Sequence, residues 1–252
     1  MSHLLSGRLK DRLAGSTSFG LIWLSLGHPA VAEIAAHCGA GAVVFDLQHG
    51  LWDKASYEAA AGLAIGRVPV MARVAQNTPF AIGSALDAGV DGVLVPMVET
   101  VEQAAQAVSS ACFPPHGIRS GGGVRPLATG FADYLDRADG IAVGVMIETT
   151  TGVDNAGAIA AVPGLDFVLI GTGDLAIACA ASGGGEDAVG AACTNVLNAC
   201  TSAGVPCGIF TTDVRQAAER RDEGYRLVVL ANDIDVVRRG FADAAKSFEA
   251  VE

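Results

Sequence analysis

The stretch Ile141-Ala142-Val143-Gly144-Val145-Met146-Ile147-Glu148 is an apolar run, rich in β-branched residues, that stops at a carboxylate. Such a continuous run is typical of a strand whose two faces are both covered, as in a parallel sheet flanked by helices. Similar runs recur along the chain at Phe19–Leu24, Ala42–Phe45, Val68–Ala72, Gly92–Val95, Phe167–Ile170, Pro206–Phe210 and Leu227–Leu230. Together with Ala142–Ile147 they make eight candidate parallel strands.

Ala-rich amphipathic segments separate these runs and predict helices. They are Pro29–His37, Lys54–Ile65, Pro79–Ala88, Val101–Ser109, Asn155–Ala161, Ala188–Ala203, Val214–Glu223 and Asp233–Phe248. Strand–helix units without a break in composition predict one (β/α)8 TIM barrel, an α/β fold in a single domain spanning residues 1–252. A doubly wound open sheet is the alternative, although it usually has fewer strands. We also predict a long functional loop from Phe113 to Gly130, where Gly and Pro are frequent.

The composition argues against several classes of function. A net charge of −11 and a pI of about 4.8 disfavour a nucleic-acid partner, because an acidic surface repels phosphate. No apolar run reaches the roughly 18 residues of a membrane span. The six cysteines form no C-x-x-C pair and have no zinc-finger spacing, so we interpret them as buried thiols in a reducing compartment. These features predict a cytoplasmic protein that acts on small molecules.

The catalytic residues of a barrel lie at the C-terminal ends of its strands. Glu148 and Asp174 follow two neighbouring predicted strands, where two carboxylates are able to share one cation. Oxygen ligands favour Mg²⁺ or Mn²⁺, with water and substrate oxygens completing the coordination. For Asp174, a cap at the start of the following helix is an equally good interpretation. For Glu148 capping is less natural, and metal ligation is favoured.

Asp46, His49 and Arg73 follow the second and third predicted strands. The spacing of Asp46 and His49 predicts a carboxylate–imidazole hydrogen bond that would orient the ring and raise its basicity. A purely structural histidine is an equal alternative. Arg73 is expected either to form an ion pair with Asp46 or to bind an oxyanion, and the sequence leaves both interpretations open.

A set of short motifs, in order along most of the chain, resembles the HpcH/HpaI class II aldolase family. The motifs are Gly20-Leu21-Ile22-Trp23, Phe45-Asp46-Leu47-Gln48-His49-Gly50, Ala72-Arg73, Leu86-Asp87-Ala88-Gly89, Val95-Pro96-Met97-Val98, Phe113-Pro114-Pro115-His116-Gly117-Ile118-Arg119, Met146-Ile147-Glu148-Thr149 and Ile170-Gly171-Thr172-Gly173-Asp174-Leu175. The resemblance implies a TIM barrel and a metal-dependent aldolase that is specific for pyruvate.

The resemblance also implies roles for individual residues. Glu148 and Asp174 match the two protein ligands of a divalent metal, Mg²⁺ or Mn²⁺ with Co²⁺ as a further candidate. Arg73 matches the arginine that stabilises the enolate, and His49, paired with Asp46, matches the base. The residues expected to contact the substrate are Trp23, Gln48, Gly171, Thr172, Gly173 and Arg119.

The assembly implied by the resemblance is a hexamer, a trimer of dimers in which a terminal helix is exchanged between barrels. Asp87 matches an acidic residue that reaches the site of a neighbouring subunit, and Asp233–Phe248 is the candidate for the exchanged helix. We therefore expect a homo-oligomer.

Three departures from the family pattern concern the second substrate. Gln48 stands where the family commonly has Glu, Gly171-Thr172-Gly173-Asp174 lacks the usual proline, and Ser120–Pro126 differs from the family pattern. We predict a carbon–carbon lyase that cleaves a 4-hydroxy-2-oxo acid to pyruvate, or a related 2-oxo acid, and an aldehyde. A citrate-synthase-like enzyme that joins oxaloacetate and acetyl-CoA, as in siderophore biosynthesis, is the alternative. A ligand-sensing barrel without activity is the third hypothesis.

Overall fold

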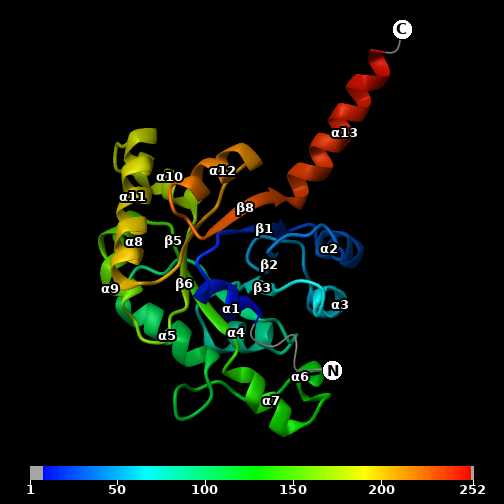
Figure 1. The fold of residues 1–252 in the computed structure, drawn as a ribbon, viewed down its shortest axis with the longest axis vertical. Helices are drawn as coiled ribbons and strands as arrows, with labels where there is room; N and C mark the ends of the chain where they lie inside the picture. Colours follow the sequence, from blue (N-terminus) through cyan, green and yellow to red (C-terminus); the bar gives the residue numbers. More distant parts are fainter. Residues whose placement is uncertain (1–7, 251–252) are drawn as a thin grey trace.

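The computed structural model describes residues 8–250, which form a closed barrel of parallel strands with helices around it (Figure 1). The strands are β1 (Phe19–Leu24), β2 (Ala42–Asp46), β3 (Val70–Arg73), β4 (Gly92–Val95), β5 (Ala142–Ile147), β6 (Phe167–Ile170), β7 (Cys207–Ile209) and β8 (Leu227–Asn232). Each strand pairs with the next, and β8 pairs with β1 to close the barrel. The predicted (β/α)8 fold is confirmed, and the open-sheet alternative is wrong because the sheet has no free edge.

Helices connect successive strands and cover the outside of the barrel, except for α1, which precedes β1, and α13, which follows β8. They are α1 (Arg8–Ala14), α2 (Pro29–Ala36), α3 (Lys54–Ala64), α4 (Pro79–Leu86), α5 (Val101–Ala111), α6 (Val124–Leu127), α7 (Phe131–Ala138), α8 (Thr150–Asp154), α9 (Ala156–Ala160), α10 (Thr172–Ala181), α11 (Glu186–Ala203), α12 (Val214–Asp222) and α13 (Asp233–Glu249). Figure 1 shows that α13 projects away from the barrel. Within residues 8–250, no helix has the length and apolar character needed to cross a membrane.

The structure differs from the sequence prediction in several segments, and α1, α7 and α8 have no counterpart among the predicted helices. The Gly- and Pro-rich segment between α5 and β5 is not one long loop, because it contains the short helix α6 and ends where α7 begins at Phe131. After β6, helix α10 begins at once at Thr172. Gly171 and Gly173 conceal this start in the sequence, since glycine is a poor helix former.

Side chains alternate along each strand between the barrel interior and the surrounding helices. In β2, Val44 belongs to the interior cluster, whereas Val43 and Phe45 pack against the helix layer. Because the period of a strand is two residues, Asp46 continues the inward-facing row at the C-terminal end. By the same alternation Arg73 follows Met71, Glu148 follows Met146 and Gly171 follows Leu169 on the inward-facing rows of β3, β5 and β6.

The two mouths of the barrel therefore differ in character. At the N-terminal mouth, α1 contributes Leu9 and Leu13 to the interior cluster. At the C-terminal mouth, the inward-facing rows end in charged residues and glycine. This polar end is where the candidate site lies.

Candidate active site

Asp46 and Arg73 form a buried ion pair at the C-terminal mouth. Their Cα atoms are partners in the register of β2 and β3, so the two side chains start side by side. Arg73 Nε donates to Asp46 Oδ1 at 2.9 Å, and Arg73 Nη2 donates to Asp46 Oδ2. Only 2% of Asp46 and 8% of Arg73 is exposed. Of the two expectations for Arg73, the structure shows the ion pair, and Nη1 is left over for a further acceptor.

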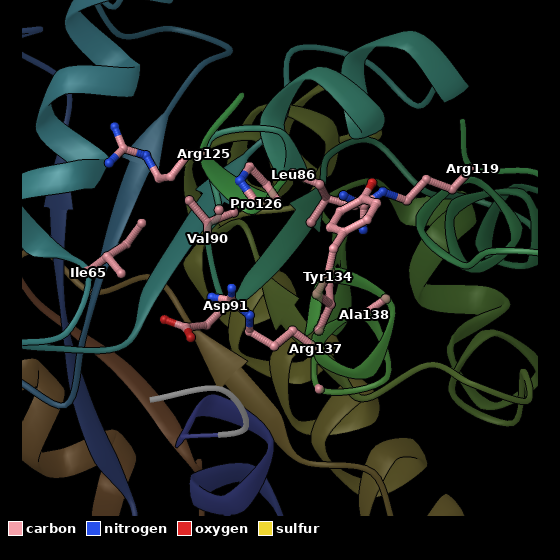
Figure 2. A pocket seen from close by; sticks show the side chains of 13 residues that line it. Ile65, Leu86, Val90, Asp91, Arg119, Arg125, Pro126, Tyr134, Arg137 and Ala138 are labelled. Carbon is pink, nitrogen blue, oxygen red and sulfur yellow. The ribbon is translucent and has the colours of Figure 1, made fainter. Parts of the chain in front are cut away.

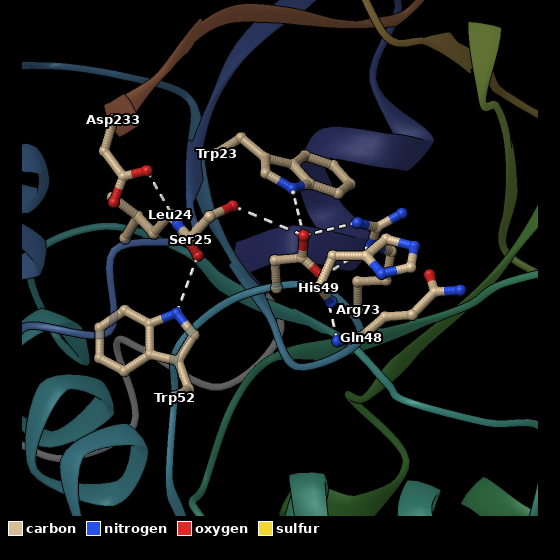
Figure 3. Close-up of polar contacts among 9 residues, drawn as sticks. Trp23, Leu24, Ser25, Gln48, His49, Trp52, Arg73 and Asp233 are labelled. Atoms are coloured by element: carbon tan, nitrogen blue, oxygen red, sulfur yellow. Dashed lines mark hydrogen bonds and ion pairs between the residues drawn. The ribbon is translucent and has the colours of Figure 1, made fainter. Parts of the chain in front are cut away.

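The Asp46 carboxylate also organises the residues around it (Figure 3). Trp23 Nε1 donates to Asp46 Oδ2 at 3.3 Å, and the backbone N–H groups of Gln48 and His49 donate to Oδ1 at 3.0 and 3.1 Å. Burial alone would raise the pKa of Asp46, but the hydrogen bonds and charge of Arg73, with the His49 N–H and Trp23, hold that pKa below its ordinary value. Asp46 is therefore a fixed anion that holds Arg73 and the loop after β2 in place.

The expected hydrogen bond between Asp46 and the His49 ring is absent, and that part of the sequence interpretation is wrong. Both Asp46 oxygens face Arg73, and the contact with His49 is through its backbone N–H. Within the described chain no hydrogen bond holds the His49 ring, which is exposed at the rim. The neighbouring Gln48 has a buried Oε1 without a hydrogen-bond partner in this part of the structure.

Glu148 lies just beyond β5 and is 1% exposed. Its Oε1 accepts a hydrogen bond from the Met97 backbone N–H at 2.7 Å. Met97 has a φ of 56°, a left-handed conformation that is unusual for a residue other than glycine. Burial raises the pKa of Glu148, and the hydrogen bond from the Met97 N–H opposes this rise. The negative charge of Asp174 raises the pKa further, and smaller effects come from Arg73, which lowers it, and from Asp46, which raises it. The four charged groups thus lie within electrostatic reach of one another.

Asp174 lies in the first turn of α10, and the N-cap is Gly171, which has no side-chain cap. The structure therefore does not support the alternative interpretation of Asp174 as the N-cap. Gly171 also packs against Glu148, since a Cβ at Gly171 would lie 2.2 Å from Glu148 Oε2. The Thr172 hydroxyl donates a hydrogen bond to the Phe210 carbonyl at 3.0 Å, which fixes the position of this side chain. The first backbone N–H groups of α10 are left without intrahelical partners and form a potential anion site.

The carboxylates of Glu148 and Asp174 fit a hard divalent cation. Both supply oxygen ligands. The negative charge of Asp174 disfavours ionisation of Glu148, and a bound cation would relieve this repulsion between the two carboxylates. The absence of a side chain at Gly171 allows Glu148 to pack closely against the turn that begins α10, the helix that carries Asp174. No group of three or more His, Cys, Asp or Glu side chains is arranged for a metal within residues 8–250. The fit therefore rests on two protein ligands, with the remaining positions left for water and substrate.

Sequence reasoning missed two contacts that shape the site. One is the Met97 N–H, because no sequence signal announces a left-handed methionine. The other is Asp233, the first residue of α13, whose Oδ1 and Oδ2 accept hydrogen bonds from the backbone N–H groups of Ser25 and Leu26 at 2.9 and 3.0 Å. Ser25 Oγ in turn lies 3.5 Å from Asp46 Oδ2. Asp233 was visible only as a polar residue after the last strand.

Two predicted site residues lie away from this cluster within the chain. Asp87 is the C-cap of α4, close to the N-terminal end of β4. Arg119 lies in the segment after α5 and stacks on Phe113 and Tyr134. Their expected contacts with substrate, for Asp87 in a neighbouring subunit, stay predictions that a single chain does not test.

The model of the HpcH/HpaI aldolase/citrate lyase family matches residues 20–239 of the chain. The chain belongs to this family. It is 34% identical to a hydroxypyruvate/pyruvate aldolase of Paraburkholderia phytofirmans over 238 residues, which cover 90% of the chain and 91% of the relative. A solved HpcH/HpaI aldolase/citrate lyase family protein from Burkholderia cenocepacia J2315 has a TM-score of 0.89 and 34% identity, and the match covers 96% of the chain and 99% of that protein.

A citrate synthase, SbnG, shares the fold at lower identity. Its TM-score is 0.83, its identity is 24%, and the match covers 96% of the chain and 97% of that protein. At this identity the likeness shows the fold alone. The aldolase relatives are closer, and this member of the HpcH/HpaI family is a carbon–carbon lyase of the aldolase type. The expected family, fold and reaction type are confirmed.

Proposed function

We propose that this chain catalyses the reversible, metal-dependent cleavage of a 4-hydroxy-2-oxo acid into pyruvate, or hydroxypyruvate, and an aldehyde. The observation that carries the proposal is the convergence of Glu148, Asp174 and the Asp46–Arg73 pair at one mouth of the barrel. The name of the Paraburkholderia relative supports a pyruvate-type donor. Joining such a donor to an aldehyde gives a 4-hydroxy-2-oxo acid by the chemistry of the aldol reaction.

Each residue has a distinct task in this scheme. Cleavage leaves negative charge on the 2-oxygen of the departing enolate, and Arg73 Nη1 is the donor that remains to stabilise it. The exposed His49 ring takes the proton of the 4-hydroxyl group as the bond between C3 and C4 of the substrate breaks. Gln48 Oε1, buried and without a partner in the described chain, accepts a hydrogen bond from a substrate hydroxyl. Trp23 forms the floor beneath these groups, 5.2 Å from Phe210 in an edge-to-face contact.

The cofactor in this proposal is Mg²⁺ or Mn²⁺, with Co²⁺ as a further candidate, held by Glu148 and Asp174. When bound, it would supply positive charge beside the oxygen atoms of the 2-oxo acid. The N–H groups at Gly171, Thr172 and Gly173, at the start of α10, would hold the substrate carboxylate. No residue has to serve as a covalent nucleophile.

The test is an assay of the full chain with pyruvate and glycolaldehyde, with Mn²⁺ or with EDTA. We expect aldol product only with metal, and Glu148→Gln should lose at least about a hundredfold in rate, as for loss of electrostatic stabilisation. Electron paramagnetic resonance of Mn²⁺ should show loss of binding in the same variant. Glu102→Gln, an exposed residue of α5, is the matched control and should behave as wild type. Full activity of Glu148→Gln would refute the assignment.

The synthase alternative is tested in the same experiment with oxaloacetate and acetyl-CoA. Release of CoA that is insensitive to EDTA, without aldol activity, would favour a condensing enzyme. Arg73→Ala tests whether Arg73 stabilises the enolate in addition to pairing with Asp46, because loss of an oxyanion donor should lower kcat by about a hundredfold. A change below about threefold would leave Arg73 with a structural role only.

We further propose that the chain acts as an oligomer, a hexamer in which α13 is exchanged between barrels. Helix α13 points away from the barrel in Figure 1 and exposes large apolar side chains. They include Ile234, Val237, Phe241 and Phe248, of which Phe241 is 74% exposed. Analytical ultracentrifugation of wild type and Phe241→Glu tests this, since the variant should dissociate.

The six cysteines, all free thiols, support a reducing compartment such as the cytoplasm.

A further inference from the structure

A cavity of about 220 Å³ lies beside the N-terminal ends of β4 and β5, at the end of the barrel opposite the candidate active site. Figure 2 shows side chains from α4, α6, α7 and the adjoining loops around it, with Ile65 from the segment just after α3. Ile65, Leu86, Val90 and Ile141 supply apolar wall, and Arg119, Arg125 and Arg137 bring cationic side chains. Such a mixture of apolar surface and a few polar groups is typical of a small-molecule site.

The three arginines differ in what holds their guanidinium groups. Arg125 donates to the Glu58 carbonyl at 2.7 Å, and Arg137 forms an ion pair with Asp133. Arg119 is 4% exposed, and its Nε and Nη1 are buried without a hydrogen-bond partner in the described chain. Asp87 acts on Arg119 electrostatically, but no ion pair joins the two within residues 8–250.

A buried guanidinium without a paired anion is costly, and stacking on aromatic rings offsets only part of that cost. The Arg119 carbon Cζ lies 4.8 Å from the centre of the Phe113 ring and 5.7 Å from that of Tyr134. Burial lowers the pKa of Arg119 from its ordinary value. The packing thus holds a cation in place and leaves its hydrogen-bonding capacity unused.

Tyr134 offers a second donor at the same end of the cavity. Its hydroxyl oxygen accepts a hydrogen bond from the Gly122 N–H at 3.0 Å, and its own proton has no acceptor among the described residues. The carboxylate in the cavity wall is Asp91, whose Oδ2 accepts from the Val70 N–H. Figure 2 places Asp91 on the opposite side of the cavity from Arg119. An anion is therefore favoured at the Arg119 end.

We propose that this cavity binds a small organic monocarboxylate with a short apolar body. The carboxylate lies at Arg119 and Tyr134, where one guanidinium balances one negative charge. The apolar body lies against Leu86, Val90 and Ile141. The site is separate from the catalytic cluster, and the rest of the surface, on a protein of net charge −11, offers an anion little attraction.

The test is isothermal titration of the full, EDTA-treated chain with sodium hexanoate. We expect one saturable site per chain with a Kd of about 1 mM. Arg119→Met, which keeps the length of the side chain, should weaken binding at least tenfold. Tyr134→Phe, a conservative change that folds even if Arg119→Met does not, should weaken it at least threefold. His49→Ala, a change of an exposed residue at the other mouth, is the control for binding there and should leave the affinity unchanged.

Three results would overturn the proposal. The first is no saturable binding to wild type below about 10 mM, which is also the outcome if a second subunit fills the cavity. The second is binding that His49→Ala removes and that Tyr134→Phe leaves unchanged. The third is binding of inorganic phosphate as tight as that of hexanoate, because phosphate has no apolar body; we expect it to bind at least tenfold more weakly.

Discussion

Asp46 and Arg73 occupy the last register position shared by β2 and β3, and a two-point ion pair joins their side chains. Hydrogen bonding between the two strands therefore sets the position of the Arg73 guanidinium. Because Nε and Nη2 are both committed to Asp46, the plane of the guanidinium group is fixed before any substrate binds. Pre-organisation of this kind stabilises charge in a transition state without a cost of reorientation.

Asp46→Asn should lower the free energy of unfolding by about 3–5 kcal/mol, because it leaves the charge of Arg73 buried and unpaired. Urea denaturation at neutral pH measures the loss. The matched control is Glu219→Gln, which breaks the exposed Arg215–Glu219 pair and should change stability by less than about 1 kcal/mol. Equal effects of the two substitutions would contradict a structural role for the buried pair.

The difference in stability between wild type and Asp46→Asn should depend on pH. The pKa of Asp46 is lower in the folded than in the unfolded chain, so the folded chain holds its proton less tightly. The contribution is fully present above the unfolded value of about 3.9 and is lost as pH falls through the folded pKa. Unfolding curves from pH 7 downwards should converge only below about pH 4. Convergence between pH 5 and 7 would point to another group.

Glu148 should have the opposite pH dependence in the metal-free protein. Its pKa is raised in the folded state, so its contribution to stability is present below the unfolded value of about 4.3 and is lost as pH rises through the folded pKa. Glu148→Gln should therefore unfold at a higher temperature than wild type at pH 7, in EDTA, and this advantage should shrink in acid. A lower melting temperature of the variant at pH 7 would show that Glu148 stabilises the fold even without a cation.

Two glycines in one turn give a matched pair of substitutions. A Cβ at Gly171 would lie 2.2 Å from Glu148 Oε2, whereas a Cβ at Gly173 would have no heavy atom within 4 Å. Gly171→Ala should displace Glu148 and lower kcat at least about tenfold, since small misplacements of catalytic groups are costly. Gly173→Ala keeps its backbone N–H and should stay within about threefold of wild type. Steady-state kinetics of both variants would show whether space beside Glu148 is what matters.

Met97 tests whether the left-handed turn serves the site. Met97→Gly keeps the N–H and suits a positive φ, so the hydrogen bond to Glu148 and the activity should survive. Met97→Val should cost about 1–2 kcal/mol in stability, because a β-branched residue is strained in this conformation. It should also reduce turnover as the N–H moves away from Glu148. Thermal denaturation and kinetics of the pair provide the measurement, and equal stability of the two would argue against strain at this position.

The strands and most helices were predictable from the sequence for simple reasons. Parallel strands covered on both faces read as apolar runs, and the helices between them carry a period near 3.6. The misses fall where local composition and tertiary structure disagree. Thr172–Ala181 begins with a Gly-rich turn, and Val124–Leu127 is a single helical turn in a Gly-rich segment. In both places the surrounding fold, and not local propensity, decides the conformation.

The polar residues of the site were predictable because they continue inward-facing rows at the strand ends. Their hydrogen-bond partners were predictable only in part. The Asp46–Arg73 ion pair was one of two interpretations that the sequence left open. Sequence spacing also suggested that Asp46 would bond to the His49 ring, but Arg73, 27 residues away in the chain, takes both carboxylate oxygens. Register between strands decides that competition, and register is not visible in one strand. Asp87 and Arg119 lie away from this mouth within the chain, and their expected contacts with substrate stay predictions.

The hydrogen bonds from Ser25 and Leu26 to Asp233 join the projecting helix α13 (Figure 1) to the C-terminal mouth of the barrel. Asp233 is the first residue of α13, and its carboxylate accepts from the two backbone N–H groups just after β1. The hydroxyl of the same Ser25 lies 3.5 Å from Asp46 Oδ2. A contact that changed the direction of α13 would therefore act on Ser25 and, through it, on the carboxylate that holds Arg73.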